Sequence, residues 1–299
     1  MKAFFKISLK LVRLSFEIIK PPAAYDGVRV YSGRLFAMDK VIMIGTFEFL
    51  GFHFTKKMLE EGMEVVGVHF NKEKKESYLI EEKRLQIGRN ANFLEEKFNS
   101  FNGEGFESAP LIVDYYDFFM REDEEQLVAL IENQLLLQNR EKIIFLLPLS
   151  IFNKEFKDNR NNLEKLISSV KKQNQFVQEF FLPTVYGPWQ SEAFLFQQTF
   201  VKKRDEWKLT AREWTADALY VEDVVANILK LMEQDEKRYF LKNAVSDAWK
   251  KCAKFLEIEE VPVRTIDRGD DGCEVIVHQA TSFEMGLIKQ KNIIETLGM

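Results

Sequence analysis

Residues 41–70, VIMIGTFEFLGFHFTKKMLEEGMEVVGVHF, decide the fold. Val41–Ile44 is a short apolar run that ends at a glycine, which is typical of a buried strand before a turn. An amphipathic stretch from about Gly51 to Glu61 predicts a helix, and Glu64–His69 is a second apolar run. A strand, a helix and a further strand in this order indicate two parallel strands joined by a helix.

The same alternation continues along the chain. Further strands are predicted at Leu111–Val113, Ile143–Leu147 and Phe176–Leu182. Helices are predicted within residues 72–100, where Phe93 and Leu94 are read as helical, and at Glu122–Gln138 and Asn159–Gln173. This pattern predicts an α/β fold, a doubly wound parallel sheet of the Rossmann-like type.

After Gly187 the pattern changes to helices separated by short strand-like pieces at Leu219–Val221, Val261–Ile266 and Glu274–Val277. We therefore expect three parts. They are an N-terminal extension of residues 1–37, a nucleotide-binding domain of residues 38–187, and a small C-terminal α+β region of residues 188–299 that serves a substrate.

The composition excludes several classes of function. The net charge of the 299 residues is −5, so the chain has no overall basic field for nucleic acid. Two cysteines and three widely spaced histidines argue against a disulfide scaffold and a metal site. No apolar run reaches the ~18 residues that a spanning helix needs, and no secretory cleavage site is visible. We expect a cytoplasmic protein.

Residues 1–20 have the pattern of a basic amphipathic helix, with lysine and arginine on one side and large apolar side chains on the other. Such a helix could lie on an anionic membrane surface. Alternatively, Met38 is the true start, because the first strand begins directly after it, and residues 1–37 are then not functional. Both readings stay open from the sequence.

The turn between the first strand and the first helix is the best candidate for a binding site. A glycine-rich turn at this place lets the pyrophosphate of a dinucleotide contact backbone N–H groups at a helix N-terminus. Gly45 and Gly51 suit this role, but Glu48 stands between them. A carboxylate beside a pyrophosphate costs roughly 1–4 kcal/mol.

The segment at residues 41–70 resembles the opening of the extended short-chain dehydrogenase/reductase family, which includes the NAD-dependent epimerases and dehydratases of nucleotide sugars. Four later segments are similar to family motifs in the same order: Val113–Asp117, FFLPTVYGPWQ at Phe180–Gln190, Leu219–Val225 and Ser282–Leu287. The resemblance covers most of residues 38–290.

The resemblance implies an NAD or NADP cofactor and a substrate like a nucleotide sugar. It implies that Asp114 recognises adenine and that His69 stands where an acid usually holds the ribose. His69 with Lys72 and Lys74 could suit a 2′-phosphate, although a solvated lysine-rich surface is the simpler interpretation. The residues assigned to the cofactor are Gly45, Thr46, Phe49, Leu50, Gly51, His69, Asp114 and Tyr115.

Catalysis is where the sequence departs from the family. The family uses a Tyr-x-x-x-Lys pair for proton transfer, and no such spacing occurs in this chain. One alignment puts Phe156 and Arg160 at these positions. Another, which the single helix between Leu147 and Phe176 favours, makes Ile143–Leu147 the fourth strand and removes a whole strand–helix unit. Tyr186 is then the remaining candidate acid.

Three functional hypotheses follow. The first is an NAD(P)-binding, epimerase/dehydratase-like protein that has lost the usual catalysis. The second is an active epimerase, dehydratase or reductase that uses an atypical acid such as Tyr186. The third is a non-catalytic scaffold that reaches a membrane through residues 1–20. The sequence predicts no oligomeric state.

Overall fold

The computed structural model describes residues 39–70, 74–103, 105–106, 108–132, 140–174, 176–259, 261, 263–264 and 272–298. The chain divides into two compact units, Met1–Arg34 and Leu35–Met299, and the described residues all belong to the second. The predictions for residues 1–37, for Lys72 and for half of Val261–Ile266 fall outside the described residues. No helix in the described ranges is both long and apolar enough to cross a membrane.

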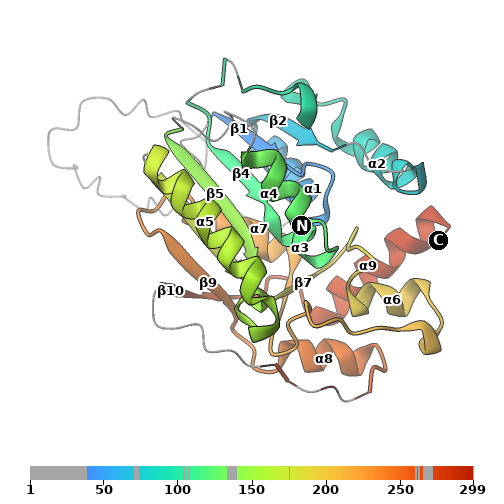
Figure 1. Ribbon diagram of the computed structural model, residues 1–299. Coiled ribbons are helices and arrows are strands. Elements are labelled where there is room, and N and C mark those ends of the chain that lie inside the picture. Colours follow the sequence, from blue (N-terminus) through green and yellow to red (C-terminus); the bar gives the residue numbers. More distant parts are fainter. Residues whose placement is uncertain are drawn as a thin grey trace, which may run out of the picture. The chain divides into compact units, whose positions relative to one another are not determined.

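One eight-stranded sheet, parallel throughout, forms the centre of the second unit, in the order β10-β9-β6-β5-β4-β1-β2-β3 (Figure 1). Its strands are β1 (Lys40–Ile44), β2 (Glu64–His69), β3 (Phe93–Lys97), β4 (Leu111–Asp114), β5 (Lys142–Pro148), β6 (Phe176–Leu182), β9 (Arg238–Asn243) and β10 (Cys273–Val277). From β3 to β6 the order is that of a doubly wound sheet. The predicted fold class is confirmed.

Helices cover both faces of this sheet. In Figure 1, α4 and α5 lie in front of it, and α1 and α7 lie behind it and pack on each other. The helices are α1 (Phe49–Glu60), α2 (Lys74–Ile87), α3 (Tyr115–Met120), α4 (Glu124–Glu132), α5 (Lys157–Gln173), α6 (Leu195–Val201), α7 (Val221–Leu231), α8 (Ala248–Phe255) and α9 (Phe283–Leu297).

Burial on both faces explains why the central strands are apolar without alternation. In β1, Val41–Ile44 are fully buried, as are Ile143–Leu147 in β5. Each such side chain contributes about 1.5–3 kcal/mol when it leaves water. These runs therefore form the core that places the turn after β1.

Two strands differ from the prediction. Residues 93–97 form strand β3, not part of a helix, because FLEEK is an edge strand with partly exposed, polar side chains that weaken its pattern. Arg238–Asn243 forms β9, which the sequence analysis missed. Because β9 pairs with β6 and β10 with β9, residues 188–299 continue the main sheet. The domain boundary at residue 187 stays a prediction, and two strands from beyond it belong to the main sheet.

The alignment that removes a strand–helix unit is also wrong. β4, not Ile143–Leu147, lies beside β1, with Ile42 opposite Leu111. Ile143–Leu147 belongs to β5, which lies one strand further out and leads into α5 and then β6. The doubly wound order is complete, so no unit is missing.

Some of the elements after β6 form a second group outside the main sheet, with β7 (Thr184–Tyr186), β8 (Ala218–Tyr220), α6 and α9 in contact. β7 and β8 form a small parallel pair. Gln290 of α9 accepts a hydrogen bond from the Gly187 N–H group (3.1 Å) and donates to the side chains of Gln190 and Gln197 (2.8 Å each). This buried amide fastens the last helix to the turn after β7.

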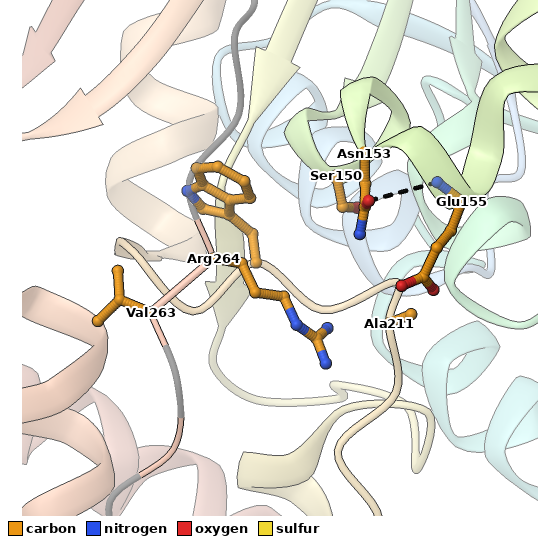
Figure 2. Close-up of a pocket in the computed structure, with 7 residues that line it drawn as sticks. Ser150, Asn153, Glu155, Ala211, Val263 and Arg264 are labelled. Atoms are coloured by element: carbon orange, nitrogen blue, oxygen red, sulfur yellow. Dashed lines mark hydrogen bonds between the residues drawn. The ribbon is translucent and has the colours of Figure 1, made fainter.

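Short 3₁₀ turns after β5, Leu149–Phe152 and Lys154–Phe156, face the segment that precedes β8. A cavity of about 320 Å³ lies between them (Figure 2). Ligands of open α/β sheets bind outside the carboxyl ends of the strands. The turn after β1 and this cavity after β5 are therefore the two places where a ligand is expected.

Candidate functional site

The turn after β1 has the backbone of a dinucleotide-binding turn. Gly45 has a φ of +91°, which L side chains rarely adopt. At Gly51 a Cβ atom would lie 1.9 Å from the carbonyl oxygen of Gly45, so a side chain there would push α1 away from the strand. Both predicted glycines are required by this strand–turn–helix geometry.

The N–H groups at the start of α1 are already hydrogen-bonded. Leu50 donates to Asp117 Oδ2 (2.6 Å) and Gly51 donates to Asp114 Oδ2 (3.0 Å). Asp114 ends β4 and also caps α3, where its Oδ1 accepts from the Asp117 N–H group. These N–H groups are the ones that a helix N-terminus offers to an anion. In this chain, two of its own carboxyl groups take that place.

Phe47 and Glu48 close the turn from the other side. Glu48 is 5% exposed, and its Oε2 lies 2.6 Å from Arg121 Nη1 in an ion pair. Phe47 is buried against the rings of His69 and Phe93. Lys83 of α2 is also buried, and its Nζ donates to the Phe47 carbonyl oxygen (2.7 Å).

Three carboxyl groups occupy the place that a further anion would take at the turn. Burial, followed by the neighbouring Asp117 carboxylate, raises the pKa of Asp114 well above its usual value. Burial also raises the pKa of Asp117. A pyrophosphate would meet these two groups and Glu48, with the Arg121 cation already paired. The residues of the closed turn therefore do not fit a dinucleotide in this arrangement.

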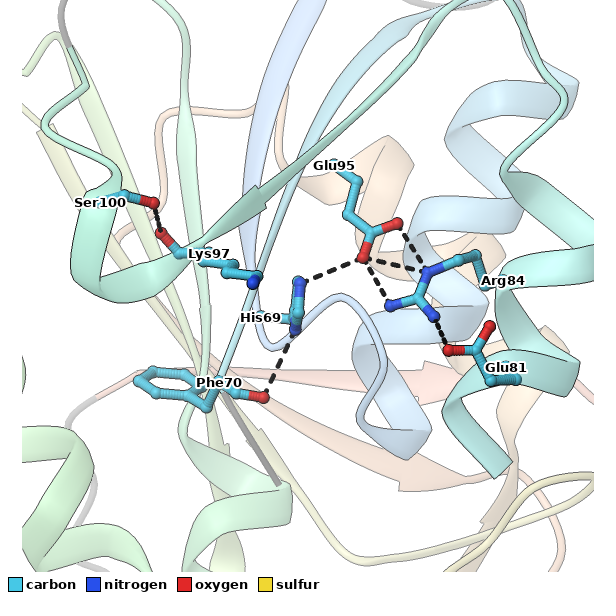
Figure 3. A network of polar contacts seen from close by, with 7 residues as sticks. All are labelled: His69, Phe70, Glu81, Arg84, Glu95, Lys97 and Ser100. Atoms are coloured by element: carbon cyan, nitrogen blue, oxygen red, sulfur yellow. Dashed lines mark hydrogen bonds and ion pairs between the residues drawn. The ribbon is translucent and has the colours of Figure 1, made fainter. Parts of the chain in front are cut away.

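His69, predicted at the ribose position, belongs to a polar network (Figure 3). Its Nε2 lies 3.1 Å from Glu95 Oε1 on the neighbouring strand β3. Glu95 also accepts from Nε and Nη2 of Arg84 on α2, and Arg84 pairs in turn with Glu81. The family places an acid at the end of β2. Here the nearby carboxylate is Glu95 of β3, and it already pairs with His69 and Arg84.

Three further residues assigned to the cofactor are buried in packing contacts. Thr46 Oγ1 lies 2.8 Å from Thr55 Oγ1, a bond between the turn and α1. Phe49 packs against His53 and Phe194. Tyr115 stacks on Phe119, and burial raises the pKa of its hydroxyl. The sequence analysis did not assign Lys83, Asp117 or Arg121, which complete the closure.

No protein-family model and no curated protein sequence matches this chain. Solved structures do match. A UDP-glucuronic acid 4-epimerase variant from Bacillus cereus, solved with NAD and a UDP-4-deoxy-4-fluoro sugar acid, aligns with a TM-score of 0.58 and 13% identity over 86% of this chain and 99% of that chain. A UDP-glucose 4-epimerase from Bifidobacterium longum, solved with NAD+ and UDP, aligns with a TM-score of 0.57 and 12% identity over 86% and 98%.

A dTDP-glucose 4,6-dehydratase from Bacillus anthracis, solved with NAD, gives a TM-score of 0.55 and 14% identity over 87% of this chain and 97% of that chain. These neighbours are epimerases and dehydratases of the extended short-chain dehydrogenase/reductase family, and this chain shares their fold. The resemblance seen in the sequence motifs is thus confirmed at the level of the fold, and nearly the whole length of each neighbour is covered.

The helix that follows β5 is α5, and it is the helix on which one alignment places Phe156 and Arg160 at the Tyr and Lys positions. Phe156 precedes its first residue and Arg160 lies in its first turn. The Phe156 ring packs against Phe119 and lies under the guanidinium of Arg212. The Arg160 guanidinium lies over the Phe152 ring. Neither Phe156 nor Arg160 is a group that could act as a general acid near neutral pH.

Tyr186, the remaining candidate acid, is fully buried against Tyr220 and Phe196. Burial raises the pKa of its hydroxyl far above the usual value, which opposes proton donation near neutral pH. Within the described ranges, no three His, Cys, Asp or Glu side chains form a group that could hold a metal ion.

Proposed function

We propose that this protein is a non-catalytic relative of the NAD-dependent epimerases and dehydratases, in which the dinucleotide position is closed by the chain's own side chains. The observation that carries the proposal is the pair of hydrogen bonds from Leu50 and Gly51 to Asp117 and Asp114. They replace the anion that the start of α1 would otherwise bind.

The energetics of displacement support this proposal. A dinucleotide would have to break two hydrogen bonds to carboxyl groups, each worth about 0.5–1.5 kcal/mol. It would also separate Glu48 from Arg121 or place its own charge beside that pair. Neighbours with this fold were solved with NAD bound. The sequence motifs therefore predict that this chain binds NAD or NADP, and the closure of the turn argues against that prediction.

The missing proton donor supports the same proposal. The chain contains no Tyr-x-x-x-Lys spacing, and the complete strand order favours the alignment with Phe156 and Arg160 at those positions. A phenylalanine ring cannot exchange a proton with a substrate hydroxyl. Absence of turnover is therefore the expected behaviour.

The test is titration of the full chain with NAD and with NADP, by calorimetry and by thermal unfolding. At a ligand concentration of 100 times Kd, a bound cofactor would add about 2.7 kcal/mol to the unfolding free energy. We expect no heat of binding and no shift in Tm. Binding of either cofactor with a Kd near or below about 100 μM, equivalent to roughly −5.5 kcal/mol, would overturn the proposal.

A gain-of-binding variant tests the cause of the closure. Glu48→Gly combined with Asp117→Ala removes two carboxyl groups and leaves Arg121 facing the turn. We expect measurable NAD binding to this folded variant. Removal of two exposed acids elsewhere, Glu274→Ala with Glu295→Ala, is the matched control and should bind nothing. If the double variant is folded by circular dichroism but binds no NAD, these side chains are not what closes the position. Glu48→Gly alone serves where the double variant does not fold.

A further inference from the structure

The cavity after β5 differs from the closed turn because two opposite charges face it, and neither is in an ion pair with another described residue. Its walls come from the 3₁₀ turns after β5 and from two C-terminal segments. The lining residues are Ser150, Asn153, Glu155, Ala211, Trp214, Val263 and Arg264. Figure 2 shows the Arg264 guanidinium and the Glu155 carboxylate on its two sides. Its volume of about 320 Å³ suits a small molecule, since ligand pockets begin at about 300 Å³.

Arg264 is held in place by the backbone around it. Its Nη1 donates to the carbonyl oxygens of Thr210 and Glu213, and its own N–H group donates to Thr215 Oγ1 (3.0 Å). A guanidinium has five N–H donors. The Nε and Nη2 hydrogens have no partner among the described residues, so one edge of a fixed cation remains available.

Among the described residues, no carboxylate forms an ion pair with Arg264. The Glu213 side chain turns into the core, where it accepts from the Leu195 N–H group (2.9 Å) and from Trp249 Nε1 (3.4 Å). No ion pair joins Arg264 to Glu155, and the Glu155 carboxylate has no partner among the described residues. The backbone anchors keep Arg264 from swinging across to Glu155.

The remaining walls can orient a bound molecule. Asn153 Oδ1 accepts from the Glu155 N–H group (3.3 Å), so its NH2 group remains to donate. The Ser150 hydroxyl adds a short polar group, and the Trp214 ring and Val263 give an apolar side. A ligand here meets a cation at one end, an anion at the other and an apolar wall between them.

We propose that this cavity binds a small zwitterion, with its carboxylate on the Arg264 edge and its ammonium on Glu155. Arginine recognises carboxylates through two parallel N–H···O bonds, and this edge offers donors in that geometry. A ligand with one charge alone would leave the opposite charge without a partner. This inference is independent of the closed turn, because it involves other residues and another class of ligand.

The experiment uses the full chain and a series of ω-amino acids in which the distance between the charges grows: glycine, β-alanine, γ-aminobutyrate and 5-aminopentanoate. Butyrate and butylamine carry the same groups singly. Calorimetry or ligand-observed NMR should show at least one member of the series binding about tenfold or more tightly than both single-charge probes. Equal affinity for the zwitterion and butyrate would overturn the proposal, as would a Kd above about 10 mM for every member, weaker than roughly −2.7 kcal/mol.

Two variants separate the ends of the ligand. Glu155→Gln removes an exposed carboxylate, so it should fold normally and bring the best zwitterion to the affinity of butyrate. Arg264→Gln should weaken the same zwitterion about tenfold or more. Glu141→Gln, an exposed acid before β5, is the matched control and should change nothing. Unchanged selectivity in Glu155→Gln would overturn the proposal even if Arg264→Gln fails to fold. The NAD titration has a separate readout, so either proposal can fail alone.

Discussion

The turn after β1 and the cavity after β5 lie at the same end of the sheet, yet they use their charges in opposite ways. In the turn, Glu48 pairs with Arg121, and Asp114 and Asp117 accept the first N–H groups of α1. In the cavity, Arg264 is anchored by backbone carbonyls and faces Glu155 without pairing. At this end of the sheet, the turn after β1 is therefore closed by the chain's own side chains, while the cavity after β5 is open to a ligand.

This difference shows that a chain can keep the backbone geometry of a binding turn without keeping a site that a ligand can enter. The glycines keep the geometry of a dinucleotide turn, but side chains from β4 and α3 fill the place of the anion. A polar group that is satisfied within the chain adds stability and offers nothing to a ligand. Charged groups whose removal is costly should therefore lie in the turn, and groups whose removal changes binding should lie in the cavity.

The largest effect is expected from Arg121→Met, because it removes the guanidinium that forms an ion pair with the buried Glu48 carboxylate. Removal of one member of a buried ion pair costs about 3–5 kcal/mol. Arg264→Gln, the corresponding change in the cavity, loses only hydrogen bonds to carbonyl groups and should cost about 1–2 kcal/mol. Urea unfolding of both variants measures the contrast. Equal losses would contradict it, and Glu48→Gln added to Arg121→Met should recover part of the stability.

The pH dependence of stability is the next effect. Burial raises the pKa of Glu213, beside the cavity, from 4.5 to about 7, and that of Asp217 from 3.8 to about 6. A raised pKa in the folded state favours folding below the unfolded-state pKa, and this advantage disappears as pH rises to the folded-state value. The unfolding free energy should therefore fall between about pH 4.5 and pH 7.

For Glu213 alone this fall amounts to about 3 kcal/mol, at about 1.4 kcal/mol per pKa unit. Asp114 and Asp117 act in the same direction. Glu213→Gln should flatten the profile over this range, while an exposed change such as Glu141→Gln should leave it steep. Urea midpoints from pH 4 to pH 8 give the answer, and a stability that rises toward pH 7 would show that these carboxyl groups are not buried as described.

Gly51→Ala tests the close approach of α1 to the turn. The new Cβ atom has no room beside the Gly45 carbonyl oxygen, so the helix must shift. Overpacking of this kind costs about 1–3 kcal/mol. Ser169→Ala, on the exposed side of α5, is the control and should be close to neutral. A neutral Gly51→Ala variant would mean that α1 is not held against the turn.

The smallest effect is expected from Glu95→Gln, which weakens the network that fills the ribose side of the closed turn. Glu95 is 28% exposed and pairs with His69 and Arg84, so the loss should be below about 1 kcal/mol. Glu96→Gln on the same strand has no such partners and should cost still less. If Glu95→Gln opened the turn, NAD binding would appear in the titration described above.

The sequence predicted the fold well where patterns are local. Apolar runs gave β2 and β6 with their observed bounds, and the spacing of Gly45 and Gly51 located the turn. Edge strand β3 was lost because polar side chains mask its period. Strand β9 was lost among helical segments, although its pairing with β6 joins the C-terminal part to the sheet.

The closure of the turn depends on contacts that no local pattern contains. Leu50 and Asp117 are 67 residues apart, and Gly51 and Asp114 are 63 apart. A signal was nevertheless present. Glu48 in the turn, with Asp114 and Asp117 at a strand end expected beside it, places three acids around an anion site. The sequence analysis identified only Glu48 as an acid that opposes a pyrophosphate at the turn, and it did not count Asp114 and Asp117 with it.

The hydrogen bonds of the buried Gln290 amide can form only late in biosynthesis, after α9 has been made. Its bond to Gly187 joins residues 103 positions apart, and at about 5–20 residues per second a ribosome needs roughly 5–20 s to make that intervening chain. During this interval the Gly187 N–H group and the amides of Gln190 and Gln197 have no Gln290 to bond. Nascent or shortened chains that end before α9 should consequently recruit chaperones, whereas the finished chain should release them.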